Sequence, residues 1–255
     1  MLRASLPHIY VAPGQAKKSS IGLLLRVACI RAAALPPSTD AMALTRQIYE
    51  LPHPPQVVGY ITGGGMQLAP WLLSTPGASQ SVLELQMPYS RKSLSQILGQ
   101  EPQHFCSAGV ARELATAAFQ RACRLCEPTA VSSAVCLGVG CTASLRSEPM
   151  KRGDHRCYVA VCTATGIHEL ALTLAKGART RQLEDAVVGR IALLAIAHAS
   201  GISVPGGVHS AGSFWRLNAD DTGDAEAISA ERLEHRYIEH VEELSQKGSE
   251  PDSVA

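Results

Sequence analysis

Two glycine segments that follow apolar stretches are the strongest chemical signal in this sequence. Thr62-Gly63-Gly64-Gly65 comes directly after Val57–Ile61 and before a helical pattern, and Gly138-Val139-Gly140-Cys141-Thr142 ends a second apolar stretch. Backbone N–H groups in such a turn, together with the start of a helix, favour a phosphate or another anion. The alternative is that the first segment is only a tight turn. We predict two anion-binding loops, in which the ligand contacts Thr62, Gly63, Gly64, Gly65, Gly138, Gly140 and Thr142.

A basic stretch follows the second glycine segment. Positions 146–156 contain Arg146, Lys151, Arg152, His155 and Arg156, and Lys176, Arg179 and Arg181 come later. Guanidinium groups bind phosphates through paired, charge-assisted hydrogen bonds. We predict that Arg146, Arg152 and Arg156 contact a phosphorylated small molecule, with a solvated basic surface as the alternative.

The eight cysteines of the chain do not have the spacing of a metal site. Cys123 and Cys126 form one C-x-x-C pair at the end of a helical pattern, and no second pair follows at that spacing. Zinc and redox sites usually need a second pair, histidine ligands or a strand-to-helix context. We therefore expect structural cysteines, no metal and no cofactor, and keep a metal or redox role for the pair as the alternative.

Alternating apolar stretches and helical patterns place these residues in an α/β fold. Residues 157–163 and 168–175 read as two strands joined by a hairpin, which makes the sheet mixed rather than all parallel. The prediction is a three-layer α/β/α sandwich over residues 43–202. Ligands of open α/β sheets gather at the carboxyl ends of strands, so we expect both glycine segments at one sheet edge. Helices are expected at 43–51, 66–73, 90–98, 107–126 and 180–200.

The two ends of the chain differ from this body. Residues 1–41 are rich in Arg, Ala and Ser, which suits a transit peptide to the mitochondrial or plastid matrix. A disordered extension, or translation from Met42 in a cytoplasmic protein, is the alternative. The apolar stretch Ile21–Leu35 is interrupted by Arg26 and Arg31, so no membrane span is expected.

The acidic end of the chain reads as a linker and a helix. We expect the folded domain to end at residue 202 and residues 203–227 to form a linker. Residues 228–247 carry an apolar stripe at helical spacing, formed by Ala230, Leu233, Tyr237, Val241 and Leu244. We expect this helix to dock on its own domain or on a dimer mate, with a separate protein partner as the alternative.

Composition excludes several classes of function. Apolar residues make up 46% of the chain and charged residues 18%, which is enough for a sizeable core. A formal net charge of +1 and an aromatic content of 4% argue against nucleic-acid binding. The expected partner is a phosphorylated small molecule, and a homo-oligomer is expected.

The motifs resemble the C-terminal domain of the CinA family, whose stand-alone members are nicotinamide-nucleotide amidases. That family has E-S-C-T-G-G, then T-D-V-P-G-S-S-A, then V-T-Y-S-N-E-A-K. Here the matching positions read 59–64, 73–80 and 87–94, and the twelve-residue step from Gly77 to Tyr89 is kept. Similarity extends over roughly residues 43–202. The branch that it resembles most is eukaryotic, where a CinA-like domain precedes a nucleotidyltransferase-like domain.

The resemblance implies a serine, tyrosine and lysine machinery that this chain keeps only in part. Ser79 and Tyr89 match the family's second serine and its tyrosine, so both are candidate catalytic residues. The first serine is Tyr60 here, and the lysine is Leu94, which cannot accept a proton. Lys92 would point about 200° away from the lysine position on a helix.

Three hypotheses follow for the function. The first is a catalytically degenerate module that binds a pyridine nucleotide. The second is an active amidase of nicotinamide mononucleotide or a related nucleotide. The third is a structural or interaction subunit without catalysis.

Overall fold

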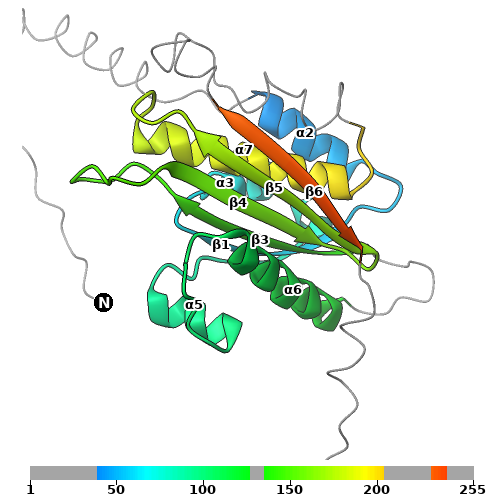
Figure 1. Ribbon diagram of the computed structural model, residues 1–255. Coiled ribbons are helices and arrows are strands. Elements are labelled where there is room, and N and C mark those ends of the chain that lie inside the picture. The colour runs from blue at the N-terminus through cyan, green and yellow to red at the C-terminus, as the bar shows by residue number, and fades with distance from the viewer. Residues whose placement is uncertain (1–38, 127–134, 204–230, 240–255) are drawn as a thin grey trace, which may run out of the picture. The chain divides into compact units, whose positions relative to one another are not determined.

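A mixed sheet with the strand order β2-β1-β3-β4-β5-β6 forms the middle of the fold (Figure 1). The computed structural model describes residues 39–126, 135–203 and 231–239. Strands β2, β1 and β3 are parallel, and β3, β4, β5 and β6 are successively antiparallel. The strands are β1 Gln56–Thr62, β2 Val82–Gln86, β3 Cys136–Ser144, β4 His155–Cys162, β5 Gly166–Leu174 and β6 Arg232–Glu239.

Helices cover both faces of the sheet, so the predicted α/β/α sandwich is confirmed. Helices α2, α3 and α7 pack together on one face, and α5 and α6 lie on the other (Figure 1). Within the described ranges, no helix has the length and apolar character needed to cross a membrane. The helices are α2 Thr39–Tyr49, α3 Leu68–Ser74, α4 Ala78–Ser81, α5 Arg91–Leu98, α6 Ala108–Leu125 and α7 Arg181–Ala199.

Helix α7 fills the larger core. Its central residues from Val187 to Ala197 are buried, and they pack on the inward side chains of β3, β4 and β5. The helix begins where Thr180 Oγ1 accepts a hydrogen bond from the Leu183 N–H, as its position in the sequence predicted. The apolar run of this helix is therefore explained by burial on nearly all sides.

Helix α6 lies unusually close to the opposite face of β3, and two glycines allow it. A Cβ atom at Gly138 would lie 2.1 Å from the backbone N of Phe119, and one at Gly140 would lie 2.1 Å from Ala111 O. Both glycines are paired with β1, opposite Val58 and Tyr60. The prediction of a glycine loop at 138–142 was therefore wrong, because these residues are inside a strand that a helix backbone touches.

The predicted helix at 228–247 is also wrong over its described part. Arg232–Glu239 is the edge strand β6, antiparallel to β5, with Leu233 opposite Leu172 and Tyr237 opposite His168. The expected contact with the chain's own domain is present, but it is strand pairing rather than helix docking. The domain boundary at residue 202 consequently moves, because β6 belongs to the same sheet. Residues 1–38, 204–230 and 240–255, which include the transit-peptide and linker predictions, lie outside the described residues.

Candidate functional site

A cavity of about 270 Å³ opens at the carboxyl ends of β1 and β3. Thr62 and Thr142, the last residues of the two paired segments, lie side by side in the register of the sheet. The expectation that both segments reach one sheet edge therefore holds for these two ends. The cavity is lined by Thr62, Gly63, Tyr89, Ser90, Arg91, Leu94, Phe105, Cys106, Thr142 and Ala143.

The two threonines position the walls of the cavity. Thr62 Oγ1 donates a hydrogen bond to Pro88 O at 3.0 Å, and Thr142 Oγ1 donates one to Phe105 O at 2.7 Å. Each hydroxyl thus ties a strand end to a segment that carries an aromatic side chain, Tyr89 in one case and Phe105 in the other. Threonine at these positions is explained by this support as well as by any contact with a ligand.

Each of these aromatic rings lies beside a guanidinium group. The Arg91 guanidinium carbon is 4.8 Å from the centre of the Phe105 ring, within the range of a cation–π contact. Arg181 Nη2 lies 3.2 Å from Tyr89 Oη and 3.3 Å from Gly63 O. The cavity therefore combines two aromatic surfaces with the positive charge of Arg91, and Arg181 contacts one of these rings from a neighbouring hollow.

The glycine turn after β1 already binds an anion, which is a side chain of the protein itself. Asp185 Oδ1 accepts hydrogen bonds from Gly65 N at 2.8 Å and Met66 N at 3.2 Å, and its Oδ2 accepts one from Gln67 N. Gly63 and Gly65 have φ values of 77° and 91°, which favour glycine. The prediction that Gly65 N–H binds a phosphate is wrong, because helix α7 supplies the carboxylate that occupies it.

A thiol and a lysine lie next to the cavity. Cys106 Sγ is 3.8 Å from Arg156 O and 4.0 Å from Thr142 O, and burial raises the pKa of this thiol while Arg156 opposes the rise. Lys151 Nζ donates a hydrogen bond to Ser144 Oγ at 2.9 Å. Burial and the charge of Arg181 lower the pKa of Lys151. This face of the sheet therefore carries a serine that is hydrogen-bonded to a lysine of reduced basicity.

The predicted basic cluster divides into separate groups. Arg156 lies in β4 opposite Ser144, near the cavity. Arg146 Nη1 instead donates to Arg179 O, and Arg146 lines a neighbouring hollow together with Arg181. Arg152 is exposed and lines none of the cavities described, so its predicted contact with a ligand in this cavity is not supported.

Two other basic residues of the cluster are buried against carboxylates. His155 Nδ1 is 2.6 Å from Glu184 Oε1, and the Arg179 guanidinium pairs with the Glu231 carboxylate. Both side chains of the second pair are fully buried. The side chains of His155 and Arg179 therefore support the fold and cannot contact a ligand at the surface.

The positions that match the family's first serine and lysine have become part of an apolar cluster. Tyr60 is 7% exposed and Leu94 is 2% exposed, and both belong to the core that packs under α6. Burial raises the pKa of Tyr60, which keeps the phenol neutral. Ser79 is exposed on α4, which precedes β2 and so lies at the amino end of the parallel strands. Ser79 and Tyr89 are consequently at opposite ends of β2, and only Tyr89 reaches the cavity.

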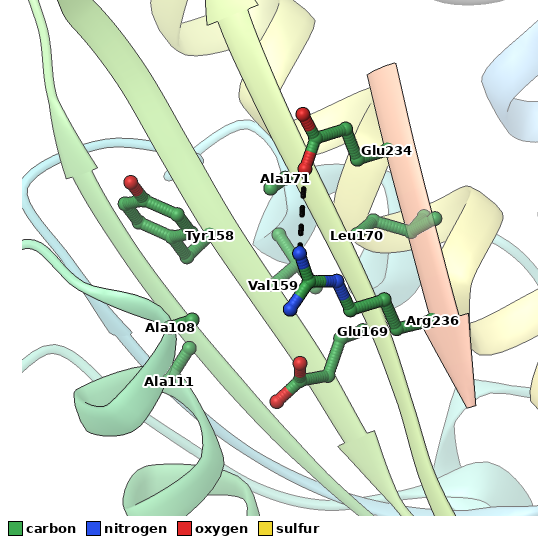
Figure 2. A pocket seen from close by; sticks show the side chains of 9 residues that line it. All are labelled: Ala108, Ala111, Tyr158, Val159, Glu169, Leu170, Ala171, Glu234 and Arg236. Atoms are coloured by element: carbon green, nitrogen blue, oxygen red, sulfur yellow. Dashed lines mark ion pairs between the residues drawn. The ribbon is translucent and has the colours of Figure 1, made fainter. Parts of the chain in front are cut away.

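A second cavity of about 240 Å³ lies between α6 and the strands β4, β5 and β6 (Figure 2). Charged side chains line it: Arg236 is 4.0 Å from Glu234, and Glu169 is 3.2 Å from Arg112 of α6. Burial raises the pKa of Glu169, and Arg112 and Arg236 lower it. This cavity contains none of the predicted site residues.

Sequence reasoning did not select Phe105, Arg91 or Cys106 as site residues. Phe105 and Cys106 line the cavity because the segment 104–107 crosses the end of β3, where the Ser107 hydroxyl caps α6, and Arg91 lines it from the first turn of α5. Of the C-x-x-C pair, Cys126 Sγ lies 2.6 Å from Cys136 Sγ, and the redox alternative for these cysteines stays a prediction.

Comparison with solved structures retrieves proteins of the CinA family. A competence/damage-inducible protein from Agrobacterium tumefaciens is 19% identical, with a TM-score of 0.47, over 63% of this chain and 95% of its own. A CinA superfamily protein from Escherichia coli is 16% identical, with a TM-score of 0.43, over 61% of this chain and 86% of its own. A competence or damage-inducible protein from Enterobacter asburiae is 12% identical, with a TM-score of 0.44, over 64% of this chain and 98% of its own.

No protein-family model and no curated protein matches the sequence. Function is therefore inferred from the chemistry of the cavity itself.

Proposed function

We propose that the cavity at the ends of β1 and β3 binds a small phosphorylated aromatic molecule of the pyridine-nucleotide class. The observation that carries the proposal is one small cavity lined by two aromatic rings and the Arg91 guanidinium, with the Arg181 guanidinium hydrogen-bonded to one of those rings from a neighbouring hollow. A volume of about 270 Å³ is near the lower end of the roughly 300–1,000 Å³ typical of small-molecule sites.

The rings and the charges recognise different parts of such a ligand. A flat heteroaromatic ring gains by packing against Tyr89 or Phe105, because offset aromatic pairs contribute about 0.5–1.5 kcal/mol beyond their buried area. A phosphate gains charge-assisted hydrogen bonds from Arg181 or Arg156, each worth about 1.5–3 kcal/mol. A ligand that carries both groups uses the whole cavity.

Hydrolysis by the family's machinery is not part of this proposal. A serine nucleophile needs a base that removes its proton, and the position of the family lysine is the buried Leu94. The position of the first serine is the buried Tyr60, so the two losses occur together in one apolar cluster. We propose a binding module whose catalytic set is degenerate.

Calorimetric titration with two matched ligands tests the proposal. Nicotinamide mononucleotide is titrated into the purified full chain, and nicotinamide riboside serves as its dephosphorylated form. Arg181→Ala and Arg156→Ala should each weaken the mononucleotide at least about tenfold and leave the riboside almost unchanged. Arg152→Ala, which removes the same charge from an exposed position, should change neither.

Two outcomes contradict the proposal. If the unaltered chain binds neither ligand, the cavity does not recognise this class. If the Arg181 and Arg156 variants weaken both ligands equally, the arginines do not read the phosphate.

Hydrolysis of a carboxamide is the second candidate, and one contact favours it. Lys151 Nζ is 2.9 Å from Ser144 Oγ. Its lowered pKa increases the fraction of the amine that is deprotonated at neutral pH and so able to accept a proton. In such a reaction Ser144 Oγ would attack the carboxamide carbon while Lys151 takes the serine proton and passes it to the departing amino group, which leaves as ammonia. Water would then hydrolyse the acyl-serine to the carboxylic acid and restore the serine. We expect ammonia release from nicotinamide mononucleotide to be absent or very weak. Robust release that Ser144→Ala abolishes and Ser79→Ala leaves unchanged would favour this candidate.

A further inference from the structure

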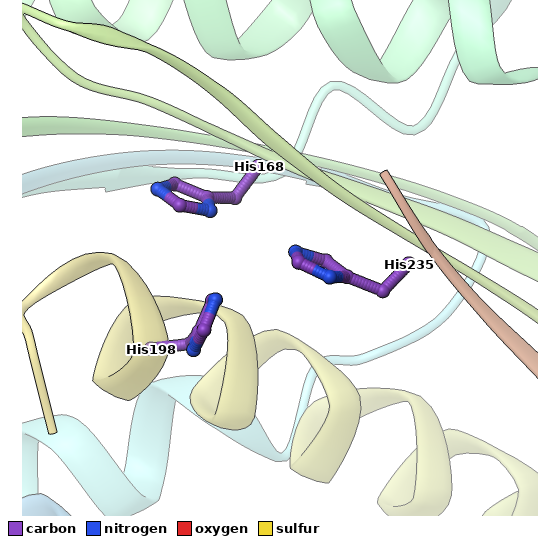
Figure 3. Close-up of side chains that lie close together, drawn as sticks. All are labelled: His168, His198 and His235. Carbon is purple, nitrogen blue, oxygen red and sulfur yellow. The ribbon is translucent and has the colours of Figure 1, made fainter. Parts of the chain in front are cut away.

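Three histidines from different elements meet on the face of the sheet that α7 covers (Figure 3). His168 lies in β5, His198 in the last turn of α7, and His235 in the edge strand β6. All three are half-buried, and one ring nitrogen of each lies within 4.8 Å of the others. The cavity of the proposed function is on the opposite face, so this cluster is a separate feature.

The strand register brings two of the histidines together. In the antiparallel pair β5–β6, His168 is opposite Tyr237 and His235 is opposite Leu170, so the two histidines are diagonal neighbours on one face. Their rings are nearly parallel, with centroids 6.0 Å apart. The His198 ring stands almost perpendicular to both, with its centroid 5.0 Å from each.

This arrangement leaves ring nitrogens directed at a common point (Figure 3). Nδ1 of His168 is buried and has no hydrogen-bond partner within the described residues. A buried polar atom without a partner costs free energy, and a bound metal ion that accepts the lone pair of this nitrogen would remove that cost.

We propose that His168, His198 and His235 form a binding site for a divalent transition-metal ion such as Zn²⁺. Neutral imidazole nitrogens are common ligands of such ions, and three histidines with one open position make a complete set for zinc. Zinc–nitrogen bonds of about 2.0–2.1 Å in a tetrahedral site place the nitrogens about 3.4 Å apart. The three nitrogens lie within 4.8 Å of one another, so side-chain rotation on binding would have to bring them to this spacing.

The ion would fasten the edge strand to the helix. His235 is the ligand from β6, and the other two ligands belong to elements of the core sheet and its covering helix. The position at the end of α7 is favourable for a cation, since the C-terminal end of a helix carries partial negative charge. The expectation of no metal came from the spacing of the cysteines, and the three histidines are far apart in the sequence.

Metal titration of the purified full chain tests the site. The chain is freed of metal with a chelator and titrated with Zn²⁺ in competition with a chromophoric chelator. We expect one ion per chain and a rise in melting temperature on binding. His235→Gln and His198→Gln should each lower zinc affinity by more than the roughly 10- to 100-fold that loss of an outer-shell partner costs.

Two control variants separate this site from other zinc ligands. His104→Gln removes an exposed histidine that is not in the cluster, and it should leave zinc affinity unchanged. Cys126→Ser tests the thiols near Cys136, which also have an affinity for zinc. Zinc binding that is lost in Cys126→Ser but kept in both histidine variants would overturn the proposal.

Cobalt gives a measurement that does not depend on any variant. Co²⁺ in a four-coordinate imidazole site should give visible absorption bands without the near-ultraviolet charge-transfer band of a thiolate ligand. If the unaltered chain shows neither these bands nor a rise in melting temperature with Zn²⁺, the histidines form only a packed ring cluster. Neither result bears on nucleotide binding, so the two proposals can fail separately.

Discussion

Replacement of Gly140 by alanine tests whether this glycine serves packing or ligand binding. The new Cβ atom would lie 2.1 Å from Ala111 O and 2.5 Å from Ala115 N, both backbone atoms of α6. A helix backbone cannot rotate away as a side chain can, so α6 must shift from the sheet or the strand must bend. Added atoms in a close-packed core usually cost about 1–3 kcal/mol, and we expect a value at the upper end of that range.

The assay is urea unfolding followed by circular dichroism, together with thermal unfolding. For a body of this size, about 3 kcal/mol corresponds to a melting temperature roughly 6–12 °C lower. Gly153→Ala is the matched control, because no atom lies within 4 Å of its added Cβ and it should not be destabilised. A Gly140→Ala variant that is as stable as the unaltered chain but loses nucleotide binding would refute the packing argument and restore the glycine-loop interpretation.

Two further predictions concern buried charge and thiol reactivity. Glu231→Gln should lower the free energy of unfolding by about 3–5 kcal/mol, because Arg179 keeps a buried charge without its partner. Urea unfolding measures this loss. Glu234→Gln, which changes an exposed carboxylate, is the control and should cause no measurable change in stability. A Glu231→Gln variant as stable as the unaltered chain would show that the pair with Arg179 does not anchor β6. Cys106 should react slowly with iodoacetamide at neutral pH and faster as the pH rises beyond the ordinary thiol pKa of 9.0, because burial raises its pKa and only the thiolate is reactive. Arg156→Ala should slow the reaction further, since Arg156 lowers the pKa of Cys106. Peptide mapping by mass spectrometry measures the rate. A faster reaction in the variant would show that the Arg156 charge does not lower this pKa.

Local patterns in the sequence were sufficient to predict the layers of the fold. Strand and helix periods differ, and the caps at Ser90, Ser107 and Thr180 each depend on a hydrogen bond to a residue three positions away. Two strand patterns joined by turn residues near position 165 likewise predicted a hairpin, and a hairpin makes the sheet mixed. The departure from the family pattern at Leu94 was also visible directly in the sequence, and its burial agrees with the loss of a lysine there.

Tertiary structure decided the role of each glycine segment. Asp185, which is 120 residues from Gly65 in the chain, occupies the N–H groups that a phosphate was expected to bind. Gly138 and Gly140 look like loop glycines in isolation, and only the position of α6 shows that they allow close helix packing. Sequence spacing carries no information on contacts of this kind.

The end of the chain illustrates the same limit of local patterns. Leu233 and Tyr237 fit a helical stripe by their four-residue spacing, yet Leu233, His235 and Tyr237 also fit the two-residue period of a strand. The open edge of β5 selects the strand, because antiparallel pairing satisfies the backbone groups of both segments. Once β6 is paired, His235 lies beside His168 and His198, so the three-histidine cluster exists only in the folded sheet.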